Sequence, residues 1–128
     1  MGHGNKENEK VFKMIILICG PQRSGKSTLA KPLAELLKAT YVTQHTYHEE
    51  LKGYVDGLVA AGNIVVIDKP CKTAASVEYL EPDYVVWLDT IEEKTEKPKH
   101  VDYHVAAWFT DTHEVLKDVV TTWMKRNT

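Results

Sequence analysis

The stretch Gly20-Pro21-Gln22-Arg23-Ser24-Gly25-Lys26-Ser27 decides the fold of this chain. Its two glycines are separated by four residues and are followed by a lysine and a hydroxyl residue, which is the pattern of a phosphate-binding loop. The glycines let the backbone bend, so that consecutive N–H groups face an anion from the positive end of the following helix. An ordinary glycine-rich turn between a strand and a helix is the alternative.

The segments on both sides of the loop have the patterns that phosphate binding requires. Before it, residues 14–19 (MIILIC) are apolar without interruption, as expected for a strand buried on both faces of a parallel sheet. After it, apolar residues recur at helical spacing, at Leu29, Leu33, Leu36 and Leu37. The order of strand, loop and helix therefore favours a phosphate-binding loop over an ordinary turn.

The side chains of the loop predict a nucleotide site that uses ATP and Mg²⁺. Lys26 would place its charge beside the β- and γ-phosphates, and Ser27 would supply a hydroxyl ligand to Mg²⁺. Arg23 is a candidate for contacting the transferred phosphate. We expect the cofactor to be bound by Gly20, Pro21, Gln22, Arg23, Ser24, Gly25, Lys26, Ser27 and Thr28.

Strands and helices alternate along the rest of the chain. Apolar and capping patterns predict further strands at residues 40–43, 63–68, 83–89 and 101–105. They predict helices at residues 26–38, 47–61 and 74–80 and a last helix that begins near residue 111. Pro32 inside the first helix predicts a bend between residues 28 and 32. Such alternation gives parallel strands with right-handed crossovers.

We therefore predict an α/β fold of the P-loop NTPase type, a three-layer sandwich with helices on both faces of a five-stranded parallel sheet in the order 2-3-1-4-5. In such a sheet, ligands bind at the carboxyl ends of the strands. Asp68 ends an apolar, β-branched strand at this edge. In phosphate-loop enzymes, an acid at the end of a strand beside the first one holds Mg²⁺ directly or through water. The alternative for Asp68 is a turn aspartate before Pro70.

Two groups of polar residues follow the second and third predicted strands at the same edge. Gln44 and His45 follow the second strand, and Lys69 and Lys72 follow the third, so these four are candidates to contact a phosphoryl acceptor. The predicted metal ligands are Ser27 and Asp68. The predicted catalytic residues are Lys26, Asp68 and Arg23.

Composition limits the class of protein. The chain has 128 residues, which we divide into a polar tail at 1–10, disordered or derived from a vector, and one domain at 11–128. The formal net charge of -2 gives no field that favours nucleic acid or an anionic membrane. No apolar run approaches the ~20 residues of a membrane span, and no signal-peptide pattern precedes the first strand. We expect a cytoplasmic protein that binds a nucleotide and a small acceptor, with a homodimer left open.

The chain resembles the nucleotide-kinase branch of the P-loop superfamily, and most closely the adenylylsulfate kinases. The loop and helix sequence Gly-x-x-x-Ser-Gly-Lys-Ser-Thr-Leu-Ala is similar to theirs, and residues 61–67 (AGNIVVI) resemble their strand after a helix-ending glycine. Leu88-Asp89-Thr90 resembles their Val-Asp-Thr. The resemblance covers about residues 15–126. It implies transfer of the γ-phosphate of ATP to a hydroxyl of adenylylsulfate or of another nucleotide or metabolite.

The chain departs from that family in two segments. Those kinases carry Asp-Gly-Asp and a nearby arginine after the second strand, where this chain has Thr43-Gln44-His45. They also have arginines in a lid after the fourth strand, whereas residues 90–99 contain none. Two further interpretations therefore stay open: a nucleotide-binding module or slow NTP hydrolase, and a degenerate kinase that binds nucleotide without turnover.

Overall fold

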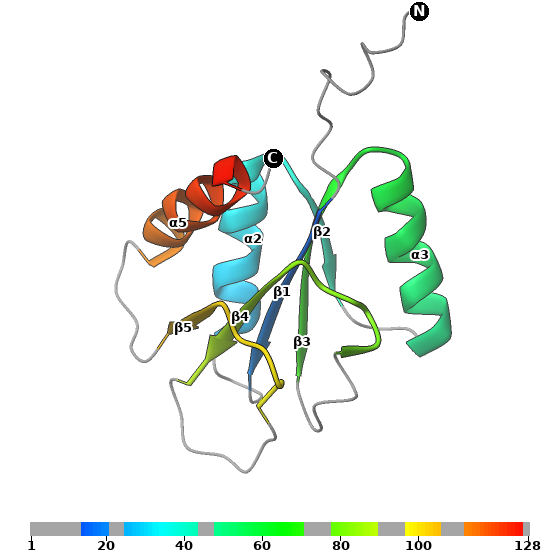
Figure 1. The fold of residues 1–128 in the computed structure, drawn as a ribbon, viewed down its shortest axis with the longest axis horizontal. Coiled ribbons are helices and arrows are strands. Elements are labelled where there is room, and N and C mark those ends of the chain that lie inside the picture. The colour runs from blue at the N-terminus through cyan, green and yellow to red at the C-terminus, as the bar shows by residue number, and fades with distance from the viewer. Residues whose placement is uncertain are drawn as a thin grey trace, which may run out of the picture.

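The computed structural model describes residues 14–20, 25–43, 48–70, 78–89, 97–105 and 112–126. These residues form a five-stranded sheet flanked by helices (Figure 1). The strands are β1 (Met14–Gly20), β2 (Thr40–Thr43), β3 (Ile64–Pro70), β4 (Tyr84–Leu88) and β5 (Tyr103–Val105). The helices are α2 (Lys26–Leu37), α3 (His48–Ala60) and α5 (Thr112–Arg126).

The sheet has the order β2-β3-β1-β4-β5, and each neighbouring pair of strands is parallel. The predicted α/β fold and strand order are therefore confirmed. All seven residues of β1 are buried, because this strand lies at the centre of the sheet and is covered on both faces. The uninterrupted apolar sequence of residues 14–19 is the local cause.

Two apolar clusters lie on opposite faces of the sheet. Because strand side chains alternate between faces, Ile16 and Ile18 of β1 belong to one cluster and Ile15 and Leu17 belong to the other. The first cluster also contains buried residues of α2 and α5, and the second contains buried residues of α3. Figure 1 shows α2 and α5 on one side of the sheet and α3 on the other, which is the predicted three-layer arrangement.

The ends of α2 have local causes. The helix begins directly after Gly25, which has φ 97° and ψ 21°, a left-handed conformation that glycine adopts most readily. It ends at Lys38, also left-handed, where the N–H of Ala39 donates to the carbonyl of Ala34 at 2.8 Å. Pro32 lies inside a continuous helical segment. The predicted bend at residues 28–32 stays a prediction.

Most boundaries lie within two residues of those predicted, and the differences have physical reasons. β3 continues past Asp68 to Pro70, because it pairs with β1 as far as Gly20. β5 begins two residues later than predicted, because Asp102 already uses its N–H and carboxylate to bond the backbone of β4. The predicted tail at 1–10 and most of the predicted helix at 74–80 lie outside the described residues. None of the helices that the structure describes is long and apolar enough to span a membrane.

Candidate functional site

The carboxyl ends of β1 and β3 place Gly20, the first residue of the predicted phosphate loop, on the strand next to Asp68. In the parallel register of these strands, Ile18 lies opposite Asp68 and Gly20 lies opposite Pro70. β1 therefore ends beside the end of β3, and α2 begins at Lys26. The predicted proximity of the loop to Asp68 stays a prediction, because residues 21–24 lie outside the described residues.

Asp68 lies on the face of the sheet that α2 covers. It is two residues after Val66, which packs in the same cluster as Leu29 and Leu33 of α2. Side chains two apart on a strand share a face. The carboxylate and the first turn of α2 thus stand on one side of the sheet, at the edge where ligands bind in parallel α/β folds.

The first turn of α2 presents its positive end at this edge. The N–H of Leu29 donates to the carbonyl of Gly25 at 3.0 Å, so the N–H groups of Lys26, Ser27 and Thr28 precede the first intrahelical bond. No side chain among the described residues caps this helix, and its first turn contains no acidic residue. Ser27 and Thr28 are exposed. These donors and the helix dipole favour an anion at this position.

Asp68 is 6% exposed and is one of two buried polar or charged residues in the part of the chain that the structure describes. A buried carboxylate requires hydrogen-bond partners. The hydroxyl of Tyr41, on β2, donates to Oδ2 of Asp68 at 2.5 Å. The Nζ of Lys31 lies 6.0 Å from the centroid of the Tyr41 ring.

Tyr41 was not among the predicted site residues. The signal that could have identified it combines strand order with alternation, since Tyr41 lies opposite Val66 on β3 and therefore shares a face with Asp68. Neither pattern by itself shows that the hydroxyl reaches the carboxylate. That contact depends on the register of β2 against β3.

The other predicted site residues are placed only in part. Gly20 ends β1, and Gly25, Lys26, Ser27 and Thr28 form the start of α2. Lys69 lies opposite Cys19 in the sheet, and nothing further is described of its side chain. The predictions for the remaining residues fall outside the described part of the chain; these are Pro21, Gln22, Arg23, Ser24, Gln44, His45 and Lys72.

The donor atoms at this edge fit Mg²⁺ bound together with a nucleotide. Ser27 and Asp68 offer a hydroxyl and a carboxylate, which are the oxygen ligands that Mg²⁺ prefers. Within the described residues, no three His, Cys, Asp or Glu side chains gather into a metal site. A cation here would complete its coordination with phosphate oxygens and water, as Mg²⁺ does in enzymes that bind nucleotide phosphates.

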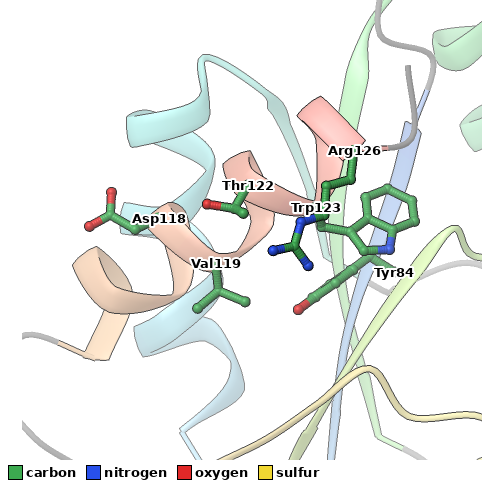
Figure 2. Close-up of a pocket in the computed structure, with 6 residues that line it drawn as sticks. All are labelled: Tyr84, Asp118, Val119, Thr122, Trp123 and Arg126. Atoms are coloured by element: carbon green, nitrogen blue, oxygen red, sulfur yellow. The ribbon is translucent and has the colours of Figure 1, made fainter.

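A pocket of about 370 Å³ lies at a different place, between α5 and the beginning of β4. Figure 2 shows that Trp123 and Arg126 reach it from the last turns of α5, next to Tyr84. The rings of Tyr84 and Trp123 meet edge to face, with centroids 5.3 Å apart. Because Tyr84 is the first residue of a parallel strand, this pocket lies toward the amino ends of the strands and is not part of the phosphate-loop edge.

Comparison with known proteins supports the fold. Neither the protein-family models nor the curated protein sequences contain a match to this chain. A crystal structure of a sugar kinase from Janibacter sp. HTCC2649, solved without ligand, superposes with a TM-score of 0.59. The match covers 88% of this chain and 94% of that chain, with 15% sequence identity. The chain therefore shares the α/β fold of a kinase of known structure.

Proposed function

We propose that this protein is a small ATP-dependent phosphotransferase that moves the γ-phosphate of ATP to a hydroxyl of a small acceptor. The observation that carries the proposal is the position of the buried Asp68. It lies on the strand next to β1 and on the face covered by the helix that begins at Lys26. An acid in that position, beside the sequence of a phosphate-binding loop, is the arrangement that holds a nucleotide with Mg²⁺.

Each residue at the edge has a proposed task in this reaction. The N–H groups at the start of α2 and the ammonium of Lys26 bind and orient the phosphates. Ser27 and Asp68 hold Mg²⁺, which when bound would neutralise negative charge on the phosphate oxygens. Phosphoryl transfer needs positioning and charge stabilisation more than covalent chemistry. These groups supply both, and Arg23 is the predicted contact to the transferred phosphate.

The acceptor is proposed to lie beside the ends of β2 and β3. Gln44 and His45 follow β2 in the sequence, while Lys69 and Lys72 lie at and after the end of β3. The sequence resemblance favours adenylylsulfate or another nucleotide, and the structural neighbour is described as a sugar kinase. An acceptor panel should therefore contain adenylylsulfate, nucleoside monophosphates and monosaccharides.

The test measures ADP formation from ATP and Mg²⁺ with and without each acceptor, for the wild type and for Lys26→Ala. Stimulation by one acceptor, lost in the variant, is the expected result. Consumption of ATP that no acceptor changes would indicate a hydrolase. Binding of ATP without any consumption would indicate a nucleotide-binding module or a degenerate kinase.

One observation favours a nucleotide-binding module or slow hydrolase as the second candidate. Kinases stabilise the transferred phosphate with arginine in many cases, and this chain has two arginines. Arg126 lies at the end of α5, where it lines the pocket toward the amino ends of the strands. No guanidinium is thus found at the phosphate-loop edge within the described ranges, and Arg23, the predicted one, lies outside them.

A further inference from the structure

The pair formed by Tyr41 and Asp68 has a feature that packing alone does not require. Tyr41 is held by two constraints, since its backbone pairs with Val66 in the parallel ladder and its ring packs against the cluster under α2 and α5. A tyrosine side chain with so few free torsions delivers its hydroxyl to one place. That place is Oδ2 of Asp68, at 2.5 Å.

The two oxygens of Asp68 are consequently not equivalent. Oδ2 accepts the hydrogen bond of Tyr41, and Oδ1 accepts none from the described residues. An unrestrained aspartate could rotate and offer either oxygen, or both, to a cation. The hydroxyl removes that freedom without adding charge, because a tyrosine hydroxyl is neutral near pH 7.

We propose that Tyr41 is a positioning residue for Asp68, which holds the carboxylate by Oδ2 and so reserves Oδ1 for Mg²⁺ or for a water bound to it. This inference rests on the proposed role of Asp68 as a metal ligand. Ligating carboxylates are in general oriented by a second hydrogen bond, and loss of such a partner costs 10–100-fold in metal affinity or activity.

Lys31 completes the arrangement from the helix side. Its ammonium lies 6.0 Å from the centroid of the Tyr41 ring, within reach of a cation–π attraction. Lys31 is on the exposed side of α2, so the contact links the helix that follows the phosphate loop to the strand that carries Tyr41.

The direct test is a titration of Mg²⁺ into protein saturated with ADP, for the wild type and for Tyr41→Phe. We expect the affinity for Mg²⁺ to fall by about 10–100-fold in the variant. The affinity for ADP measured in the presence of a chelator should stay unchanged, because the substitution removes a neutral hydroxyl whose described hydrogen bond goes to Asp68. The matched control is Tyr103→Phe, which removes a hydroxyl from a partly buried tyrosine on β5 and should bind Mg²⁺ like the wild type.

A double-substitution cycle separates positioning from a general effect on the fold. In the Asp68→Asn background, Tyr41→Phe should cause no further loss of Mg²⁺ affinity. An equal loss in both backgrounds would show that Tyr41 acts elsewhere and would overturn the inference. In steady-state kinetics, Tyr41→Phe should raise the KM for Mg²⁺ far more than it lowers kcat at saturating Mg²⁺.

The failures of the two proposals are distinguishable. If the wild type binds Mg²⁺ with ADP and Tyr41→Phe binds it equally well, the role of Tyr41 is wrong and the proposed function stands. If the wild type with ADP binds no Mg²⁺, the proposed function and this inference are both overturned. Thermal unfolding without metal verifies that the two Tyr→Phe variants are folded at the temperature of the titrations.

Discussion

The two ends of the sheet use aspartate in different ways. At the amino ends, Oδ2 of Asp83 accepts the N–H of Ile15 at 2.8 Å, and the N–H of Asp83 donates to the carbonyl of Ile15 at 2.8 Å. Asp102 forms the same reciprocal pair with Val85, also at 2.8 Å in each direction. These carboxylates satisfy backbone N–H groups where strands begin, so their role is structural.

Asp68, at the carboxyl end of β3, accepts no hydrogen bond from a backbone group of the described residues. Its hydrogen bond comes from the side chain of Tyr41, and it is buried at 6% exposure. A buried carboxylate that does not satisfy the backbone is a cost to stability. The comparison teaches that aspartates at the amino ends of the strands bond the backbone, whereas the carboxyl end of β3 holds a buried aspartate that is bonded by a side chain.

The largest expected effect is that of Lys26→Ala. Removing the ammonium should lower turnover by about a thousandfold and abolish measurable ATP binding, because no other described side chain replaces it at the start of α2. The fold should persist, which circular dichroism would show. Isothermal titration with ATP measures the binding, and Lys117→Ala on α5 is the control. An unchanged affinity for ATP in Lys26→Ala would reject the site.

The next largest effects test the difference between the aspartates at the two ends of the sheet. Asp68→Asn should lower turnover by about a hundredfold while leaving the free energy of unfolding equal or higher, because asparagine can still accept the hydrogen bond of Tyr41 and is neutral. Asp83→Ala should have the opposite effects on turnover and on the free energy of unfolding. It should cost about 1–3 kcal/mol of stability, because the N–H of Ile15 loses its acceptor, and should leave turnover per folded molecule unchanged.

Both variants are measured by urea unfolding and by the same kinase assay. The comparison is wrong if Asp68→Asn unfolds at lower urea than Asp83→Ala, or if Asp83→Ala loses turnover at temperatures where it is folded. In the first case Asp68 would be a structural residue. In the second case the amino ends of the strands would take part in the site.

A third prediction concerns adenylylsulfate as acceptor. Activity toward it should be weak, because the chain lacks the acidic pair after the second strand and has no arginine in residues 90–99. Each missing contact of this kind costs ~3 kcal/mol, or about a hundredfold in rate. Lysine can replace the charge of arginine but not its bidentate geometry. Steady-state kinetics with ATP and Mg²⁺ provide the test, and turnover of ~1–100 per second would contradict the prediction.

The smallest expected effect lies at the amino ends of the strands. Burial raises the pKa of Tyr84 to about 12 from 10.0, with further contributions from the negative charges of Asp102 and Tyr103. Since the folded state favours the neutral hydroxyl, this contribution to stability is complete below pH 10 and is lost as the pH rises toward 12. Wild type should therefore lose stability over that interval relative to Tyr84→Phe. Parallel pH profiles from urea unfolding would contradict this.

Local sequence patterns predicted most of the fold, because the spacing of apolar residues reflects which side chains of a strand or helix are buried. An uninterrupted apolar segment predicted the central strand β1, and apolar residues at helical spacing after Lys26 predicted α2. The position of Asp68 at the end of a β-branched segment placed it at the ligand edge. The sequence was less informative about ends of elements, as the continuation of β3 to Pro70 shows.

By itself, the sequence determined the alternation of strands and helices and predicted a phosphate loop and a candidate acid, because each depends on residues close together in the chain. Only the tertiary structure decided what those residues meet. Tyr41 and Asp68 are 27 positions apart, and Ile15 and Asp83 are 68 apart. Both contacts depend on the register of one strand against another, which is set by the packing of the whole sheet and not by any local pattern.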